Sequence, residues 1–371
     1  RQRYLTACLL AFYQQQKLFE DKKDPLRKFL IEKPLWVFVG GSVNAVRTEN
    51  KKKVSDVIDI LLYLASFVEN QKDTIDHIKK LLTGKADLLD EHGNDIFTRS
   101  LAYLNNQELT ADEVYDDILR VIFNASSRAK LHVENLKGSE GEIALRLGDN
   151  EPFGVINVGD ASALCKLCEG HDELVVADME FSGSLFRAIN DKESNINILI
   201  GSKKFTEGWS SWRVSTIGLM NIGRGEGPQI IQLFGRGVRL KGIDFCLKRS
   251  RRVLQNTAPA HIELVETLNI FGIRADYMSQ FNEYLKEEGL PTDDEKRKIV
   301  LPIKENVPKG DKLKVPGLKE GLEFKRNGPK PILDPQSSYL RKYPVVLNWY
   351  PKIQVKQSKG ATTLTTKAQL N

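Results

Sequence analysis

The chain has 371 residues, of which 41% are hydrophobic and 28% charged, and a formal net charge of +6 at pH 7. This length allows two domains, and the composition is ordinary for a globular protein that buries a core. No apolar run approaches the roughly 20 residues that span a bilayer, so we do not expect a membrane protein. Because the chain starts at Arg1 and no secretory segment leads it, we expect a fragment or a domain of a longer protein.

The charge is unevenly distributed along the chain. Residues 291–371 hold 17 Lys and Arg against 8 Asp and Glu, a balance of +9, which leaves −3 for residues 1–290. This asymmetry predicts a basic C-terminal region that can meet an acidic polymer. A solvated, lysine-rich surface is the alternative interpretation of the same composition.

The cysteines predict neither a disulfide framework nor a zinc site. Only Cys165 and Cys168 lie close together, and no second pair or histidine cluster completes a ligand set. Asp160 stands just before them, where a helix N-cap would, so we expect both thiols on the buried face of a helix. So few cysteines favour a reducing, intracellular setting, and we expect a cytoplasmic protein.

The N-terminal part predicts helices followed by one buried strand. Residues 4–32 carry Leu, Phe and Tyr at helical spacing, which predicts one or two amphipathic helices. The apolar run 35–40 is typical of a parallel strand that is buried on both faces. Gly41 and Ser42 follow at its carboxyl end, where open α/β sheets bind ligands, and they can present backbone N–H groups and a hydroxyl.

The middle of the chain alternates helices and strands. Residues 54–82 predict a helix that packs on a sheet, and residues 83–128 remain helical, which indicates a helical insertion over about 70–128. The other predicted elements are a hairpin from 131–133 and 142–147, strands at 153–159, 174–177, 196–200 and 214–221, and a short helix at 185–189. Together they predict an α/β fold with a doubly wound parallel sheet.

The character of the chain changes after residue 240. Residues 248–252, Lys-Arg-Ser-Arg-Arg, form a compact basic cluster, and a strand is predicted over 262–273. A helix is predicted over 274–288, with Gly289 as its stop. Prolines then recur, so residues 291–371 are expected to be extended or to form a small β region.

Two arginines close the stretch 195–242, in which much of the predicted chemistry gathers. Arg236 and Arg239 are three residues apart on a predicted helix, and Gln232 lies one turn earlier. A guanidinium offers a planar fork of donors that suits a phosphate gaining charge. Gly235 flanks Arg236 and would weaken an ordinary helix, which favours close approach of a ligand over a solvated surface helix.

The loop that follows the strand 196–200 is the second candidate element. It contains Ser202, Lys203, Thr206, Glu207 and Gly208, whose hydroxyls and backbone amides can hold a nucleotide or a nucleic-acid backbone. The glycine-rich turn 223–227 lacks the lysine and Ser/Thr of a P-loop and is interpreted as a flexible turn. No Gly-x-x-x-x-Gly-Lys-Ser/Thr and no Walker B-like Asp-Glu pair occurs, so the arginines would complete a nucleotide site whose other half lies elsewhere.

These residues carry a family resemblance. Residues 202–210 resemble motif V of superfamily 2 helicases, and residues 232–239, Gln-Leu-Phe-Gly-Arg-Gly-Val-Arg, resemble motif VI. The similarity is nearest to the helicase subunit of type III restriction enzymes and to related phage-defence DEAD/DEAH proteins. The match covers residues 195–242, with a looser likeness from Leu35 to Phe281. Position 210 is often Asp in that family and is Ser here, so a ribose or arginine-pairing role there is not carried over.

The resemblance implies a RecA-like sheet with flanking helices and ATP held between two such domains. The P-loop and the Mg²⁺ ligands would come from a first domain that this sequence lacks. Arg236 and Arg239 would contact the γ-phosphate, Arg239 as the arginine finger, and Gln232 would orient them. The nucleotide side would also include Glu207, Gly208 and Gly235, and the nucleic-acid backbone would meet Ser202, Lys203, Thr206, Gly41 and Ser42.

The expected organisation follows from this resemblance. Residues 1–33 would be a helical lead-in from the first motor domain, 34–290 the second RecA-like domain, and 291–371 a basic, proline-containing extension. We expect the C-terminal motor domain of an ATP-dependent DNA helicase or translocase, inactive on ATP when alone. Its expected partners are DNA, the P-loop domain, and a modification or specificity subunit.

Two other functions remain open from the sequence. A non-catalytic nucleic-acid-binding or assembly module with a degenerate RecA-like fold would use the basic cluster and the +9 region, where aromatics stand among lysines. A nuclease in the C-terminal part is less favoured. Its carboxylates form no Asp…Glu-x-Lys arrangement, and Glu323-Phe-Lys325 is the nearest approach.

Overall fold

Eight strands form one sheet in the order β10-β9-β1-β8-β6-β5-β4-β7. The strands are β1 Leu35–Gly40, β4 Leu131–Leu136, β5 Glu142–Leu147, β6 Gly154–Asn157, β7 Leu174–Met179, β8 Ile198–Gly201, β9 Val214–Met220 and β10 Asn269–Ile273. Neighbouring strands are parallel except β5, which runs antiparallel to β4 and β6. The predicted α/β fold is confirmed and is consistent with a RecA-like sheet. The sheet is mixed because the predicted hairpin supplies β4 and β5.

The computed structural model describes residues 1–40, 47–49, 52–89, 93, 95–97, 100–180, 183–201, 209–220, 234–235, 237–254, 258–273 and 319–320. The chain divides into the units Arg1–Lys296 and Arg297–Asn371, and all elements named here belong to the first. A separate antiparallel pair is formed by β2 Arg47–Glu49 and β3 Lys52–Val54. The predicted helix over 274–288 and the turn 223–227 lie outside the described residues, as does the predicted extension 291–371 apart from residues 319–320.

Strand β1 lies inside the sheet, between β8 and β9, and is buried on both faces as predicted. Trp36 and Phe38 point into a large core on one face, whereas Leu35, Val37 and Val39 belong to a smaller core on the other face. This alternation follows from the two-residue period of a strand, which sends successive side chains to opposite faces. An uninterrupted apolar run is what two covered faces require.

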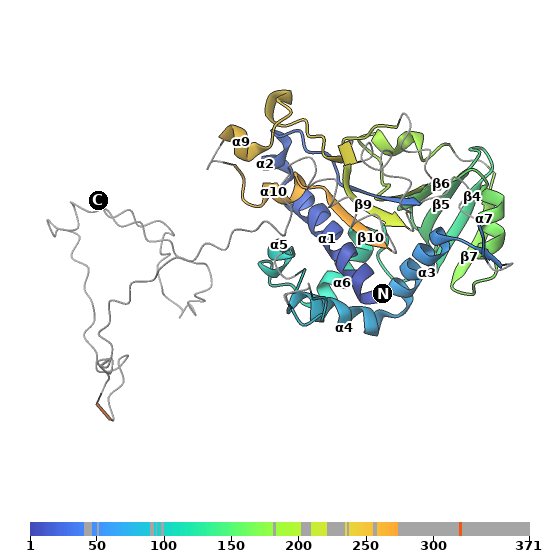
Figure 1. The fold of residues 1–371 in the computed structure, drawn as a ribbon, viewed down its shortest axis with the longest axis horizontal. Helices are drawn as coiled ribbons and strands as arrows, with labels where there is room; N and C mark the ends of the chain where they lie inside the picture. Colours follow the sequence, from blue (N-terminus) through green and yellow to red (C-terminus); the bar gives the residue numbers. More distant parts are fainter. Residues whose placement is uncertain are drawn as a thin grey trace, which may run out of the picture. The chain divides into compact units, whose positions relative to one another are not determined.

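Helices cover the face of Trp36 and Phe38. Figure 1 shows α1 running beside the sheet with α4, α5 and α6 grouped around it and α7 further along. Their bounds are α1 Gln2–Asp21, α2 Lys23–Arg27, α3 Asp56–Glu69, α4 Gln71–Leu82, α5 Ala102–Asn105, α6 Ala111–Val121 and α7 Ala161–Cys168. The opposite face carries the 3-10 turn η1 Arg187–Asn190 and the segment around Phe234.

Helix α1 is a core helix and not the amphipathic helix that the sequence predicted. Every residue from Leu5 to Gln16 is buried, which closes all sides of the helix over three turns. The apolar spacing that predicted one buried face is correct, but Gln14, Gln15 and Gln16 are buried as well, so no solvated face remains over this part of the helix. In the fold, the side-chain amides of all three instead donate to backbone carbonyls.

The three glutamines reach three different parts of the fold. Gln14 donates to the Ser100 carbonyl at 2.6 Å and accepts from the Tyr103 amide at 3.0 Å. Gln15 donates to the carbonyls of Leu264 and Thr267 at 2.8 and 2.9 Å. Gln16 donates to the Pro34 carbonyl at 2.7 Å. Since a buried carbonyl without a donor costs about 1–3 kcal/mol, these amides make it possible to bury α1 among irregular backbone.

The structure corrects several predicted boundaries. The predicted helix over 54–82 is two helices, α3 and α4, which break at Asn70 with ψ 55°. The predicted strand over 262–273 is the short helix α10, Ile262–Val265, followed by β10. The apolar residues Ile262 and Val265 stand three apart and both face inward, so their spacing fits one helical turn as well as a strand. The short helix predicted at 185–189 is the 3-10 turn η1.

Within the predicted insertion over about 70–128, the described helices are α4, α5 and α6. Helix α6 begins with a capping box in which Thr110 and Glu113 satisfy each other's backbone amides. The prediction for the cysteines is confirmed: Cys165 and Cys168 are buried on α7, and Asp160 caps it by accepting from the Ala163 amide at 2.8 Å. Among the described helices, none is long and apolar enough to cross a membrane.

Candidate functional site

The carboxyl ends of β1 and β8 lie side by side. Val39 pairs with Gly201, and Gly40 pairs with Met220 at the end of β9. The next residues along the chain are Gly41 and Ser42 after β1, and Ser202 after β8. The described strands therefore bring the starting points of both predicted loops to neighbouring positions at one edge of the sheet. The loop residues Gly41, Ser42, Ser202, Lys203, Thr206, Glu207 and Gly208 lie outside the described residues.

Arg239 lies at the other edge, beside the amino ends of β9 and β10. It lines a small pocket together with Val214 and Ser215 of β9 and with Thr267, which precedes β10. The sequence predicted that Arg239 lies on a helix, and this prediction is wrong. Phe234, Gly235 and Gly237 are helical, and Arg239 follows after the helix has ended. Its side chain is exposed, while Arg236 and Gln232 lie outside the described residues.

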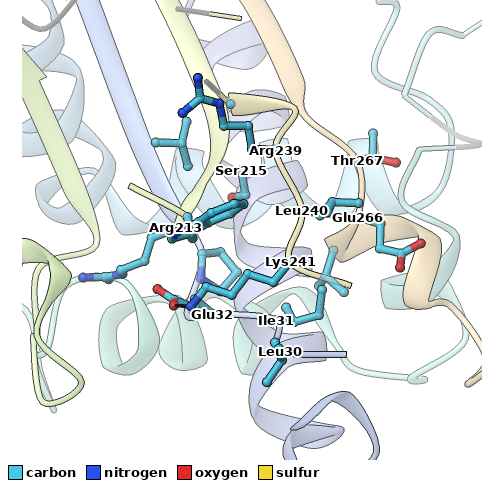
Figure 2. A pocket seen from close by; sticks show the side chains of 15 residues that line it. Leu30, Ile31, Glu32, Arg213, Ser215, Arg239, Leu240, Lys241, Glu266 and Thr267 are labelled. Carbon is cyan, nitrogen blue, oxygen red and sulfur yellow. Dashed lines mark hydrogen bonds and ion pairs between the residues drawn. The ribbon is translucent and has the colours of Figure 1, made fainter. Parts of the chain in front are cut away.

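Figure 2 shows how the charged side chains are arranged around this pocket. Lys241 reaches toward Glu32 and forms an ion pair with it, and its ammonium lies 5.7 Å from the centre of the Trp212 ring. Arg239 extends from another side of the pocket, and among the described acidic residues none pairs with it. The Ser215 hydroxyl is buried there without a hydrogen-bond partner among the described residues.

The pocket is too small for a nucleotide. Its volume is about 30 Å³, whereas sites for small organic ligands measure roughly 300–1,000 Å³. A space of this size fits a few water molecules. A nucleotide that met Arg239 would therefore lie outside the pocket and would have to be held mainly by another surface.

Arg213 supports the amino edge of the sheet from inside. Its guanidinium donates to the carbonyls of Lys33 at 3.0 Å and Ile196 at 2.6 Å, and also to that of Ile189. Only 4% of the residue is exposed. Burial lowers the pKa of Arg213 to about 10, partly offset by the Glu32 carboxylate, so the group stays charged at neutral pH. One side chain thus ties together the segment before β1, the segment before β8 and η1.

Lys33 lies close to this buried charge. Burial, together with repulsion from Arg213, lowers the pKa of the Lys33 ammonium to about 8, and the Glu20 carboxylate opposes the shift. Two cations and the Lys241–Glu32 pair therefore meet at one end of the sheet. Their arrangement holds the backbone before β1 and β9 in place.

Gly235 and Gly237, the two glycines on either side of Arg236 in the sequence, have different surroundings. A Cβ on Gly237 would come within 2.9 Å of both methyl groups of Leu268 and 3.3 Å from Ile217, so this glycine lets the helix approach the sheet. A Cβ on Gly235 would meet no atom of the described residues within 4 Å. Packing inside the described unit explains Gly237 and leaves Gly235 unexplained.

Sequence reasoning missed the residues that hold this edge together. Arg213 was not distinguished from other basic residues, although it stands directly before an apolar strand, where a charged residue is unusual. Asn197 was likewise missed inside the apolar run that leads into β8. Its side chain donates to the carbonyls of Val121 and Ile122 at 3.0 and 2.9 Å and is fully buried. A polar residue within an apolar run was the available signal in both cases.

Comparisons with protein-family models, with curated proteins and with solved structures found no match for this chain. The cysteine, histidine and carboxylate side chains of the described residues form no group that could hold a metal ion.

Proposed function

We propose that this chain is the second motor domain of an ATP-dependent DNA helicase or translocase, supplying arginines to a nucleotide site that it shares with a P-loop domain. Bound ATP with Mg²⁺ would supply the phosphoanhydride whose hydrolysis drives movement along DNA. In this proposal Arg239, with Arg236, meets the γ-phosphate. The residues after β8 and β1 meet the nucleic-acid backbone.

The observation that carries the proposal is the open space at Gly235. This glycine occupies a helical position where alanine would be more stable by about 1 kcal/mol, and no described neighbour requires its small size. A surface that approaches the backbone closely would require it. Arg239 follows this glycine by four residues, and the pocket beside Arg239 is too small for a nucleotide, which supports a site completed from outside.

The test uses the protein in which this chain is combined with its P-loop domain. Arg239→Ala should lower nucleic-acid-stimulated ATP hydrolysis by a factor on the order of 10³–10⁵, as for other arginine fingers, with an unchanged melting temperature. Arg187→Ala, at an exposed arginine of η1, is the matched control and should keep full activity. Wild-type turnover by the Arg239 variant would refute the role of this residue.

A non-catalytic nucleic-acid-binding module is the second candidate. The separation of the predicted residues favours it, because Arg239 lies at the amino edge while the predicted loops begin at the carboxyl edge. If the combined protein does not hydrolyse ATP but the chain binds nucleic acid, this candidate replaces the first. For either function we propose a cytoplasmic setting, supported by four free cysteines, and a modification or specificity subunit as a further partner.

A further inference from the structure

A basic and apolar surface lies beyond the pocket at the amino edge of the sheet. It consists of the loop 241–248 and the short helix α9, Ser250–Leu254. Its exposed residues are Asp244, Phe245, Leu247, Lys248, Arg249, Arg251, Arg252 and Val253, so four cations stand against one carboxylate. We call it the 241–253 surface.

The loop of this surface closes on itself and displays its apolar side chains outward. The Leu247 amide donates to the Lys241 carbonyl at 2.9 Å, and the Phe245 amide to the Gly242 carbonyl at 3.3 Å. Gly242 has φ 68°, and a Cβ there would lie 2.7 Å from the Lys248 carbonyl oxygen, so only glycine fits this closure. In consequence, 55% of Phe245 and 63% of Leu247 are exposed.

The backbone of the loop is strained at the residues that it displays. Phe245 and Leu247 have φ values of 60° and 58°, in the left-handed region that large side chains rarely adopt. Each such residue costs roughly 1–2 kcal/mol. Leu247 recovers little of this cost by burial, and Phe245 recovers only part of it through its contact with Trp212, which indicates that the exposure of both side chains is used.

Both ends of the surface are fixed to the rest of the fold. Lys241 pairs with Glu32, and its ammonium also lies 6.0 Å from the centre of the Phe245 ring. Phe245 packs edge-on against Trp212, with ring centres 5.9 Å apart and an interplanar angle of 79°. At the other end, the buried Glu266 carboxylate accepts from the Ser250 amide at 2.8 Å and from its hydroxyl at 3.0 Å.

The cations of this surface are not neutralised within the described unit. Lys248, Arg249, Arg251 and Arg252 are exposed, and the described acidic residues form no ion pair with them. Glu266, the carboxylate that contacts this helix, is occupied by Ser250. Four cations without an ion-pair partner and an aromatic ring held by Trp212 are complementary to a polymer that carries both phosphates and unpaired bases.

We propose that the 241–253 surface binds single-stranded nucleic acid, with phosphates at the arginines and a base stacked on Phe245. Stacking requires unpaired bases, which favours a single strand over a duplex. A membrane is disfavoured because α9 has five residues, too few for an amphipathic helix that lies in a bilayer interface. Binding at this surface does not require ATP, so it is compatible with both proposed functions.

The experiment measures binding of the full chain to a fluorescent 20-nucleotide oligothymidine at several salt concentrations. Arg249→Glu/Arg252→Glu should weaken binding and lower the slope of log K against log salt by about 1.4, because each lost phosphate contact contributes about 0.7. The matched control is Lys72→Glu/Lys79→Glu, at two exposed lysines of α4, and should leave the slope unchanged. An unchanged slope in the arginine variant would overturn the proposal.

A second variant separates stacking from apolar insertion. Phe245→Leu keeps an apolar side chain but removes the flat ring, so affinity for the oligonucleotide should fall about 5- to 100-fold while the melting temperature changes little. Vesicles containing phosphatidylserine serve as the competing probe. If Phe245→Leu leaves oligonucleotide binding intact, or if the arginine variant loses only vesicle binding, the assignment to nucleic acid is wrong.

Discussion

The two edges of the sheet differ in how far the described structure explains them. At the amino edge, Arg213, Lys241 and Glu32 form a network that accounts for the polar groups before β1 and β9. At the carboxyl edge, the strand ends Gly40 and Gly201 are neighbours, and the predicted loops begin directly after them. Between the edges lie strands of four to seven residues, or roughly 13–23 Å. Residues 195–242, which are continuous in the sequence, therefore contribute to both the amino edge and the carboxyl edge of the sheet.

The largest expected effect tests whether Arg213 holds the amino edge. Arg213→Met keeps much of the side-chain volume but leaves three carbonyl oxygens without their donor. At about 1 kcal/mol or more for each, we expect a loss of about 3 kcal/mol in the free energy of unfolding. Urea denaturation measures this. A loss below about 1 kcal/mol would show that the network at this edge contributes little to stability.

The second effect compares the two glycines that flank Arg236. Alanine stabilises a helix relative to glycine, but in Gly237→Ala the new methyl group forces Leu268 to move, which offsets this stabilisation. Gly235→Ala creates no such clash with the described residues, so it keeps the full stabilisation from helix propensity. The two variants should therefore differ by about 1–2 kcal/mol in the free energy of unfolding, with Gly235→Ala the more stable. In the combined protein, Gly235→Ala should nevertheless lower ATP hydrolysis. Full activity in that variant would remove the main support for a surface approaching Gly235.

A third prediction concerns pH and the Lys33 ammonium. Its folded pKa, about 8, lies below the ordinary value of 10.5, so the unfolded chain binds more protons between these two pH values. The charged Lys33 ammonium destabilises the folded state, and this destabilisation is fully present below pH 8. It decreases as the pH rises from 8 to 10.5, so the contribution of this group to the free energy of unfolding rises over that interval. Lys33→Met should stabilise the protein by on the order of 1 kcal/mol at pH 7.5 and by less at pH 10.

The control for the pH experiment is Lys79→Met, at an exposed position of α4. Urea denaturation of the wild type and both variants at pH 7.5 and 10 gives the required differences. If the Lys33 variant gains equally at both pH values, the buried ammonium is not the cause.

The smallest effect is expected at the carboxyl edge. Among the described residues, a Cβ on Gly40 would meet the Met220 side chain alone, at an ordinary contact distance of 3.6 Å. Gly40→Ala should therefore change the free energy of unfolding by less than about 0.5 kcal/mol. A loss as large as that of Arg213→Met would mean that the carboxyl edge is as tightly built as the amino edge.

Local patterns in the sequence predicted the strands well. The runs that became β1, β8 and β9 are apolar enough to require burial on both faces, and Asp160 before a helical pattern is a recognisable cap. The helices were harder to predict because their surroundings are non-local. The three glutamines of α1 look polar in sequence, and only the fold shows the carbonyls that they satisfy.

The candidate site was predictable only as a set of residues, and its geometry was not. Spacing alone placed Arg239 on a helix with Arg236, but the helix ends earlier, and Arg239 lies near the amino ends of β9 and β10. The division between two edges depends on the direction of each strand, which is decided by pairing between distant segments. Arg213 shows the same limitation, since its three carbonyl partners come from residues 17 to 180 positions away.

The burial of α1 has a consequence for synthesis on the ribosome. Gln15 hydrogen-bonds Thr267, which lies 252 positions later in the chain. At about 5–20 residues per second, the helix waits roughly 10–50 seconds before this partner is made. During that time its apolar sides and its three amides have no complete set of partners. The apolar sides of α1 are therefore exposed on the nascent chain until the segment around Thr267 emerges, which makes this helix the part of the chain most prone to aggregation during synthesis.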